Sequence, residues 1–184
     1  MHVLEQTRTH DGDRAAEACV HARRTVLPKR LGPPGPSPDE LQRILEAAAA
    51  APDHRQLLPW RFVLVSDNAR ARLGAAFEQA LVERDRSSTA EQRAQARDKA
   101  VRAPLLMLAV ARLEGRTAGD VPDAERLVSL GCALQNMMLV ATEMGYATAL
   151  TSGQAMQSRP LRELFSLAAG EQAVCFLNAG TVSG

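Results

Sequence analysis

The stretch APDHRQLLPWRFV at residues 51–63 is the part of the chain that says most about its fold. It joins a turn containing one of the four histidines to a Pro-Trp step and then to an apolar run. Residues 61–66 are rich in aromatic and β-branched side chains and predict a strand, which the Pro-Trp step starts in a mainly structural role. Asp53 and His54 in the turn can hydrogen-bond either a ligand or only the local backbone.

Helix signals lie on both sides of this stretch. The sequence SPDE at residues 37–40 combines a capping serine, a proline at the first helical position and a glutamate three residues on, which predicts a helix start. Pro52 predicts the end of that helix. Asp123 is expected to cap the longest helix, which runs to about Met144 and stops at Gly145. Shorter helices are predicted at 15–24, around 73–81, from a capping box of Ser88 and Glu91, and at 160–167.

Two features of these segments bear on the fold. The helix after Ser88 is dense in both charge signs, which is typical of a solvated face. The long helix ending near Met144 is apolar nearly all round, so it must be buried on all sides, in part by a second subunit. Further strands are predicted at 105–111, 146–152 and 173–179. Helices alternating with strands in this order predict a helix-covered sheet, an α/β or α+β sandwich.

Composition limits the class of protein. A chain of 184 residues with 46% hydrophobic content fits one domain, predicted at 14–184 after a flexible extension at 1–13. A net charge of +1 favours neither nucleic acid nor a membrane as the main partner. No signal-peptide core or membrane-length apolar run occurs, so a cytoplasmic location is expected. The three cysteines lack disulfide or zinc spacing, and no metal site is expected.

Two further motifs are candidates for chemistry. Arg23, Arg24 and Thr25 offer guanidinium forks and a hydroxyl that suit a phosphate, although a solvated helix end explains them equally. Residues Thr151-Ser152-Gly153 follow a predicted strand, where backbone and hydroxyl donors suit a polar ligand. A plain turn is the alternative interpretation. No glycine-rich dinucleotide motif, Walker motif or nucleophile elbow competes with these candidates.

Together, Arg23–Thr25, the 51–63 stretch and SLGCALQN at residues 129–136 resemble the nitroreductase family, and its compact branch above all. The resemblance spans residues 23–181. It implies an α+β sandwich with a central, mostly antiparallel sheet of about four to five strands flanked by helices. It also implies a homodimer that binds FMN across its interface.

The resemblance further implies roles for individual residues. Arg23, Arg24 and Thr25 would hold the FMN phosphate, and Thr151, Ser152 and Gly153 would face polar edges of the cofactor. Pro52, Asp53, His54 and Leu57 would pack near the flavin, partly from the neighbouring subunit. His54 is the candidate catalytic residue, as a proton donor beside a flavin that performs the chemistry itself.

The function expected from this resemblance is an FMN-dependent oxidoreductase. NADH or NADPH would reduce the flavin and leave, and a nitroaromatic, quinone or similar small electron-poor acceptor would follow in ping-pong order. Leu27, Leu58 and Leu150 stand where the family often has basic, polar or aromatic groups, and few residues follow Thr181. The alternative is therefore a catalytically weakened dimer that binds a flavin, another ligand or a partner protein.

Overall fold

The computed structural model describes residues 10–113 and 121–183, with side chains from Arg14 onward. Residues 1–9, part of the predicted extension, lie outside the described residues. The backbone at 10–13, predicted within that extension, already belongs to the first helix.

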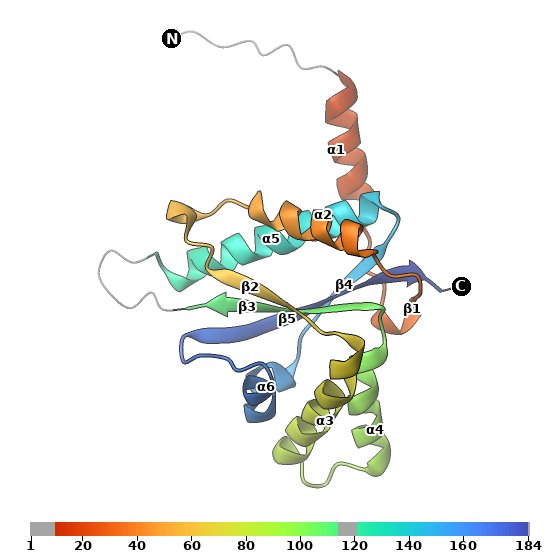
Figure 1. Cartoon of the computed structure of the whole chain (residues 1–184), viewed down its shortest axis with the longest axis vertical. Helices are drawn as coiled ribbons and strands as arrows, with labels where there is room; N and C mark the ends of the chain where they lie inside the picture. Colours follow the sequence, from red (N-terminus) through yellow and green to blue (C-terminus); the bar gives the residue numbers. More distant parts are fainter. Residues whose placement is uncertain (1–9, 114–120, 184) are drawn as a thin grey trace.

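The described residues form six α-helices and five strands (Figure 1). The helices are α1 (His10–Ala22), α2 (Pro38–Ala49), α3 (Asp67–Arg84), α4 (Ala90–Asp98), α5 (Asp123–Glu143) and α6 (Arg159–Leu164). The strands are β1 (Leu31–Gly32), β2 (Trp60–Leu64), β3 (Leu105–Arg112), β4 (Ala147–Thr151) and β5 (Glu171–Val182). Short 3-10 helices are η1 (Pro28–Arg30), η2 (His54–Gln56), η3 (Lys99–Val101) and η4 (Gln154–Gln157).

Strand β5 is the centre of the sheet. It pairs with β1, β3 and β4, and β2 pairs with β3, and every one of these pairings is antiparallel. This confirms the predicted α+β fold with a mostly antiparallel sheet. Strand β1 was not predicted, because its two residues have no strand pattern of their own and owe their conformation to pairing with Val182 and Thr181.

Helices cover both faces of the sheet, and each face has its own hydrophobic core (Figure 1). Met107, Ala109 and Leu177 pack toward α2 and α5. Leu106, Leu108 and Phe176 pack toward α3, α4 and α6. Because successive side chains of a strand point to opposite faces, a strand covered on both sides needs apolar residues throughout. Residues 105–111 are all buried, as their continuous apolar run predicts.

The ends of α2 and α5 follow local chemistry. The capping box of α2 is confirmed: the Ser37 hydroxyl accepts from Glu40 N–H at 3.3 Å, and Ser37 N–H donates to the Glu40 carboxylate at 2.8 Å. At the end of α5, Gly145 has a φ of +88°, Gly145 N–H donates to Thr142 O at 2.9 Å, and Tyr146 N–H donates to Ala141 O at 2.9 Å. These two bonds make a Schellman motif, as the predicted glycine stop requires.

Two predicted caps were wrong by one residue. The box of α4 is formed by Thr89 and Gln92, because the Ser88 backbone N–H closes a turn onto Asp85 O and its buried hydroxyl accepts from Arg93. The cap position of α5 is Pro122, so Asp123 is the first helical residue, where its charge still favours the helix dipole.

Helix α1 projects away from the layered body toward the N-terminus (Figure 1). Its contact with the body includes the Cys19 thiol, which donates to Leu139 O at 3.5 Å. No helix in the described part of the chain is long and apolar enough to span a membrane.

Candidate functional site

A cavity of about 770 Å³ lies on the α3 and α4 side of the sheet. Its lining combines apolar side chains from α3, the sheet and η4 with three basic side chains from α3 and the α4–β3 connection. The lining also includes Leu27, Pro28 and the segment Thr151–Met156. Its volume is within the range of small-molecule and cofactor sites, which combine apolar walls with a few polar groups.

The basic residues of the cavity are Arg84, Lys99 and Arg102. Arg84 ends α3, whereas Lys99 and Arg102 follow the helix whose mixed charges predicted only a solvated face. Lys99 belongs to η3 and Arg102 follows it directly, so the position of η3 decides where both charges lie. The sequence holds one indication of this role, because Lys99 and Arg102 come immediately before the buried strand β3.

The side chain of Arg70 holds the segment between η3 and β3 in place. Its guanidinium donates to Ala100 O at 2.8 Å and to Pro104 O at 2.7 Å, which ties α3 to both ends of the segment that contains Arg102. The side chain is buried, and burial lowers the pKa of Arg70 from its usual value. Its Nε atom is buried without a partner among the described residues. Arg70 was not identified from the sequence, because nothing local distinguishes it from the exposed arginines of the same helix.

Thr151, Ser152 and Gly153, which the resemblance places beside polar edges of the cofactor, all line the cavity. Asn178, which is 2% exposed, organises the end of this strand: its Nδ2 donates to Thr151 Oγ1 at 3.0 Å and to Ala149 O at 3.2 Å. Ser152 and Gly153 are exposed, so their polar groups face an incoming ligand rather than the core.

Arg23, Arg24 and Thr25 lie along the outer edge of β4. Thr25 forms a parallel bridge with Thr148, and the next residue donates its backbone N–H to Thr148 O at 3.1 Å. The Arg24 guanidinium donates to His21 O and Arg23 O, both at the end of α1. These residues do not themselves line the cavity, but the chain continues from them into Leu27 and Pro28, which do. Leu27 is 57% exposed where a basic residue was expected.

The turn with Pro52, Asp53, His54 and Leu57 lies elsewhere, and none of these residues lines the cavity. The Asp53 carboxylate accepts from Leu58 N–H at 2.6 Å, and His54 Nδ1 lies 2.8 Å from a carboxylate oxygen of Glu125 on α5. Three non-glycine residues of this turn have positive φ: Arg55 at 60°, Gln56 at 54° and Leu58 at 45°. Such conformations cost energy and cluster at functional sites.

The predicted site residues therefore separate into two groups within one chain. Thr25 bridges Thr148 of β4, and Thr151–Gly153 lie where β4 ends, whereas the turn precedes β2 at the opposite edge of the sheet (Figure 1). Thr148 pairs with Ala179, while Arg112, which donates to Pro59 O, pairs with Glu171. Along β5, at about 3.3 Å per residue, Ala179 lies roughly 26 Å from Glu171, and Phe176, which pairs with Thr151, lies roughly 17 Å from it.

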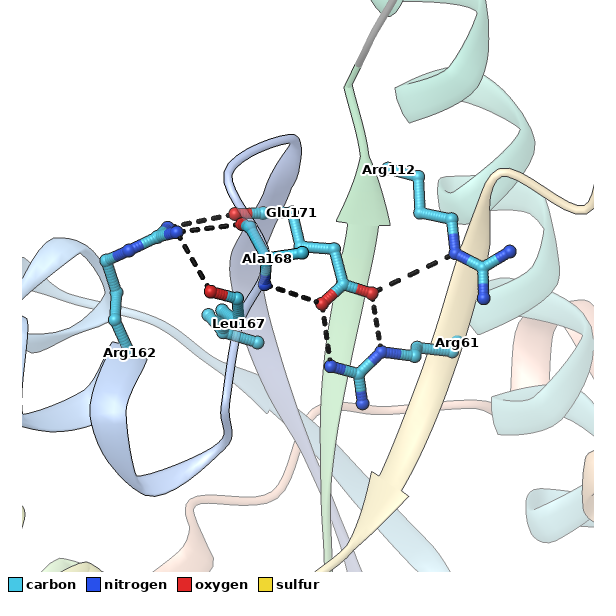
Figure 2. A network of polar contacts seen from close by, with 6 residues as sticks. All are labelled: Arg61, Arg112, Arg162, Leu167, Ala168 and Glu171. Atoms are coloured by element: carbon cyan, nitrogen blue, oxygen red, sulfur yellow. Dashed lines mark hydrogen bonds and ion pairs between the residues drawn. The ribbon is translucent and has the colours of Figure 1, made fainter.

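The end of the sheet next to the turn is braced by Glu171 (Figure 2). Its carboxylate accepts two bonds from Arg61, at 2.7 and 2.8 Å, and one from Ala168 N–H at 3.2 Å, with Arg112 at 3.9 Å. The Arg61 guanidinium, more than any other group, lowers the pKa of Glu171 to about 2. Arg162 ties the preceding loop down through backbone carbonyls, including Glu171 O at 2.9 Å. No group of three or more histidine, cysteine or acidic residues suits a metal ion in the part of the chain that the structure describes.

Comparisons with known proteins agree with this architecture. The model of the nitroreductase family matches residues 20–181. The chain is 34% identical over 152 residues to the protein named "Putative NAD(P)H nitroreductase YdjA" of Escherichia coli K12, covering 83% of this chain and 81% of that protein.

Two solved structures show the same fold. The nitroreductase-like family protein from Bacillus cereus superposes with a TM-score of 0.76 at 22% identity, covering 91% of this chain and 86% of that one. The FMN-dependent nitroreductase NfnB from Mycobacterium smegmatis, solved with NADPH, gives 0.72 at 19% identity, with 94% and 89% covered. Fold, family model and sequence relative agree, and the chain belongs to the nitroreductase family of flavin oxidoreductases.

Proposed function

We propose that this protein is an FMN-dependent NAD(P)H oxidoreductase that reduces nitroaromatics, quinones or similar electron-poor acceptors in ping-pong order. The observation that supports this most is the cavity, which combines three cationic side chains with the strand-end segment Thr151–Gly153 in a chain of this family. Membership alone would not fix the activity, because one fold hosts several functions.

The residues around the cavity fit FMN. Its volume suits a ligand of this size, and its apolar walls suit an isoalloxazine ring. Lys99 and Arg102 would compensate negative charge on the cofactor, and Ser152 and Gly153 would donate to its polar edges. We assign the phosphate to Arg23, Arg24 and Thr25 at the β4 edge, because the bonds that now hold Arg24 are to exposed backbone carbonyls that a phosphate dianion can replace.

FMN supplies the hydride chemistry when it is bound, and the protein supplies position and electrostatics. Lys99 and Arg102 favour uptake of negative charge by the ligand in the cavity, because cations near the position where charge develops stabilise it. The apolar side chains Phe77, Leu106 and Phe176 keep water from one side of the cavity, which strengthens these interactions.

We further propose a homodimer in which the turn of one subunit covers the cavity of the other. The turn lies against α5 on one face of the sheet and the cavity lies on the α3 and α4 face, so a two-fold partner is the simplest way to combine Pro52, Asp53, His54 and Leu57 with Thr151–Gly153. Apolar side chains exposed on α1 and α5 support the same arrangement, namely Val20 at 50%, Leu127 at 39% and Val128 at 65%. Light scattering at micromolar concentration is expected to give twice the chain mass, and a monomer would contradict the composite site.

A second candidate function is favoured by three exposed leucines. Leu27, Leu58 and Leu150 are 57%, 50% and 40% exposed, at positions where basic, polar or aromatic groups were expected. Each lost charged hydrogen bond would weaken cofactor binding by about 1.5–3 kcal/mol. The fold would survive such losses, leaving a dimer that binds a flavin, another ligand or a partner without efficient turnover.

The visible absorption spectrum of the purified protein, repeated after FMN addition and desalting, separates the two candidates. A retained flavin band that NAD(P)H bleaches and a quinone restores supports the oxidoreductase. A protein that cannot hold FMN supports the second candidate. The double variant Arg23→Ala/Arg24→Ala is expected to lose FMN on desalting, and full retention would refute the phosphate assignment while leaving the cavity assignment in place.

A further inference from the structure

The contact between His54 and Glu125 joins two segments that are far apart in the sequence. His54 lies in η2, Glu125 lies in the first turn of α5, and Nδ1 is 2.8 Å from the carboxylate oxygen. The two side chains are 51% and 53% exposed, so the pair lies at the surface and contributes little to stability.

The chemistry of the pair fixes the state of the imidazole. An ionised carboxylate only accepts hydrogen bonds, so Nδ1 must carry a proton at neutral pH. The other ring nitrogen, Nε2, has no protein partner among the described residues and is free to meet a ligand. A neutral imidazole in water otherwise favours the proton on Nε2. Glu125 therefore selects the tautomer that water disfavours.

The backbone holds the ring in this place. Asp53 closes the turn by accepting from Leu58 N–H at 2.6 Å, and Arg55 and Gln56 directly after His54 have positive φ. A strained turn persists only where its surroundings determine it. Here Asp53 fixes the backbone of the turn and Glu125 fixes the side chain of His54, so the direction of Nε2 is set from both sides.

We propose that Glu125 is a positioning residue that makes His54 Nε2 the proton donor to the electron acceptor. This inference rests on the proposed function, in which the turn of one subunit covers the cavity of the other. A quinone takes up a hydride equivalent that originates in NAD(P)H, and a proton from the imidazolium completes the hydroquinone. The proton leaves Nε2, the neutral ring keeps its Nδ1 proton on Glu125, and solvent reprotonates Nε2.

The first arm of the test observes the tautomer without any assay of activity. Nitrogen-15 NMR of the neutral imidazoles is expected to show His54 as the Nδ1–H form in the wild type. Glu125→Ala should return it to the Nε2–H form, and Glu125→Gln, whose amide oxygen still accepts, should retain the Nδ1–H form. Glu17→Gln is the matched control, because Glu17 lies 3.8 Å from His21 on α1 and should leave His54 unchanged.

The second arm measures quinone reduction. Removing a positioned proton donor, as in His54→Asn, is expected to lower kcat by roughly 100-fold, measured at saturating FMN so that loss of cofactor does not contribute. Glu125→Ala is expected to lower kcat about 2–5-fold at constant KM, in line with the energy of an exposed ion pair. Glu125→Gln should recover part of that loss.

Each outcome supports or overturns the inference. A wild-type His54 in the Nε2–H form overturns it whatever the activity. The correct tautomer together with an unchanged kcat in Glu125→Ala also overturns it. A wild type that neither holds FMN nor turns over refutes the proposed function and the proton-donor role with it, while the NMR arm still reports whether Glu125 sets the tautomer.

Discussion

The cavity and the turn before β2 differ in how their functional groups are held. At the cavity, Lys99 and Arg102 lie on a short segment that the buried Arg70 ties to α3, next to the regular end of β4. In the turn, His54 lies on strained backbone held by surface contacts. The difference indicates that buried contacts preform the cavity, whereas a few surface contacts determine the position of the turn, which in the proposed homodimer covers the cavity of the partner subunit.

The largest effect, a loss of FMN affinity, is expected from substitutions in the cavity alone. Lys99→Glu/Arg102→Glu is expected to weaken FMN binding by roughly 100-fold or more, since each charged hydrogen bond is worth about 1.5–3 kcal/mol. Fluorescence titration of FMN measures this. Arg72→Glu/Arg86→Glu is the matched control, because it makes the same charge change at exposed positions outside the cavity. Equal losses in the two variants would mean that net charge, not the cavity, governs binding.

The second largest effect, on the free energy of unfolding, is expected from a substitution of Glu171, whose ion pair with Arg61 lies beside the turn. Glu171→Gln removes the charge that receives two bonds from Arg61 and is expected to cost about 2 kcal/mol at pH 7, read from denaturant midpoints. Because folding lowers the pKa of Glu171 from 4.5 to about 2, its contribution is complete above pH 4.5 and disappears as the pH falls toward 2. The gap between wild type and variant should therefore close over that range, with FMN affinity at pH 7 unaffected. A gap that is independent of pH would contradict this account of Figure 2.

The smallest effect, a small gain in stability, is expected from a substitution that relieves backbone strain in the turn. Leu58 has a φ of 45° and is 50% exposed, and asparagine tolerates this conformation better than leucine. Leu58→Asn is expected to stabilise the protein by about 0.5–1 kcal/mol in thermal unfolding. Leu64→Asn is the control, since Leu64 is also 50% exposed but lies in strand β2, where the change should give no gain. A stabilisation of both variants would show that removing an exposed apolar group, rather than relieving strain, is responsible.

Much of the fold could be predicted from local signals in the sequence. The apolar run of β3, the capping box at Ser37 and the stop at Gly145 each depend on residues close together in the chain, so their patterns are visible without the fold. Strand β1 and the cap at Thr89 escaped prediction for the opposite reason. The first exists only through pairing with β5, and the second depends on a turn that already uses Ser88.

The site was harder to predict than the fold. Thr151–Gly153 was identified because it ends a visible strand, and it does line the cavity. Lys99 and Arg102 were not, because their stretch has the mixed charges of a solvated helix and only the buried Arg70 turns it toward a ligand. The separation of the turn from the cavity follows from the strand order and from which helices cover each face of the sheet, and no motif encodes either.

The most direct test of the composite site is complementation between two defective chains. One chain is Lys99→Glu/Arg102→Glu, with a defective cavity, and the other is Asp53→Ala/His54→Ala, with a defective turn. Each homodimer should be nearly inactive. In a two-fold dimer of the two chains, one site collects both defects and the other none, so the purified heterodimer should recover about half of the wild-type turnover. A heterodimer as inactive as its parents would contradict a site shared between subunits.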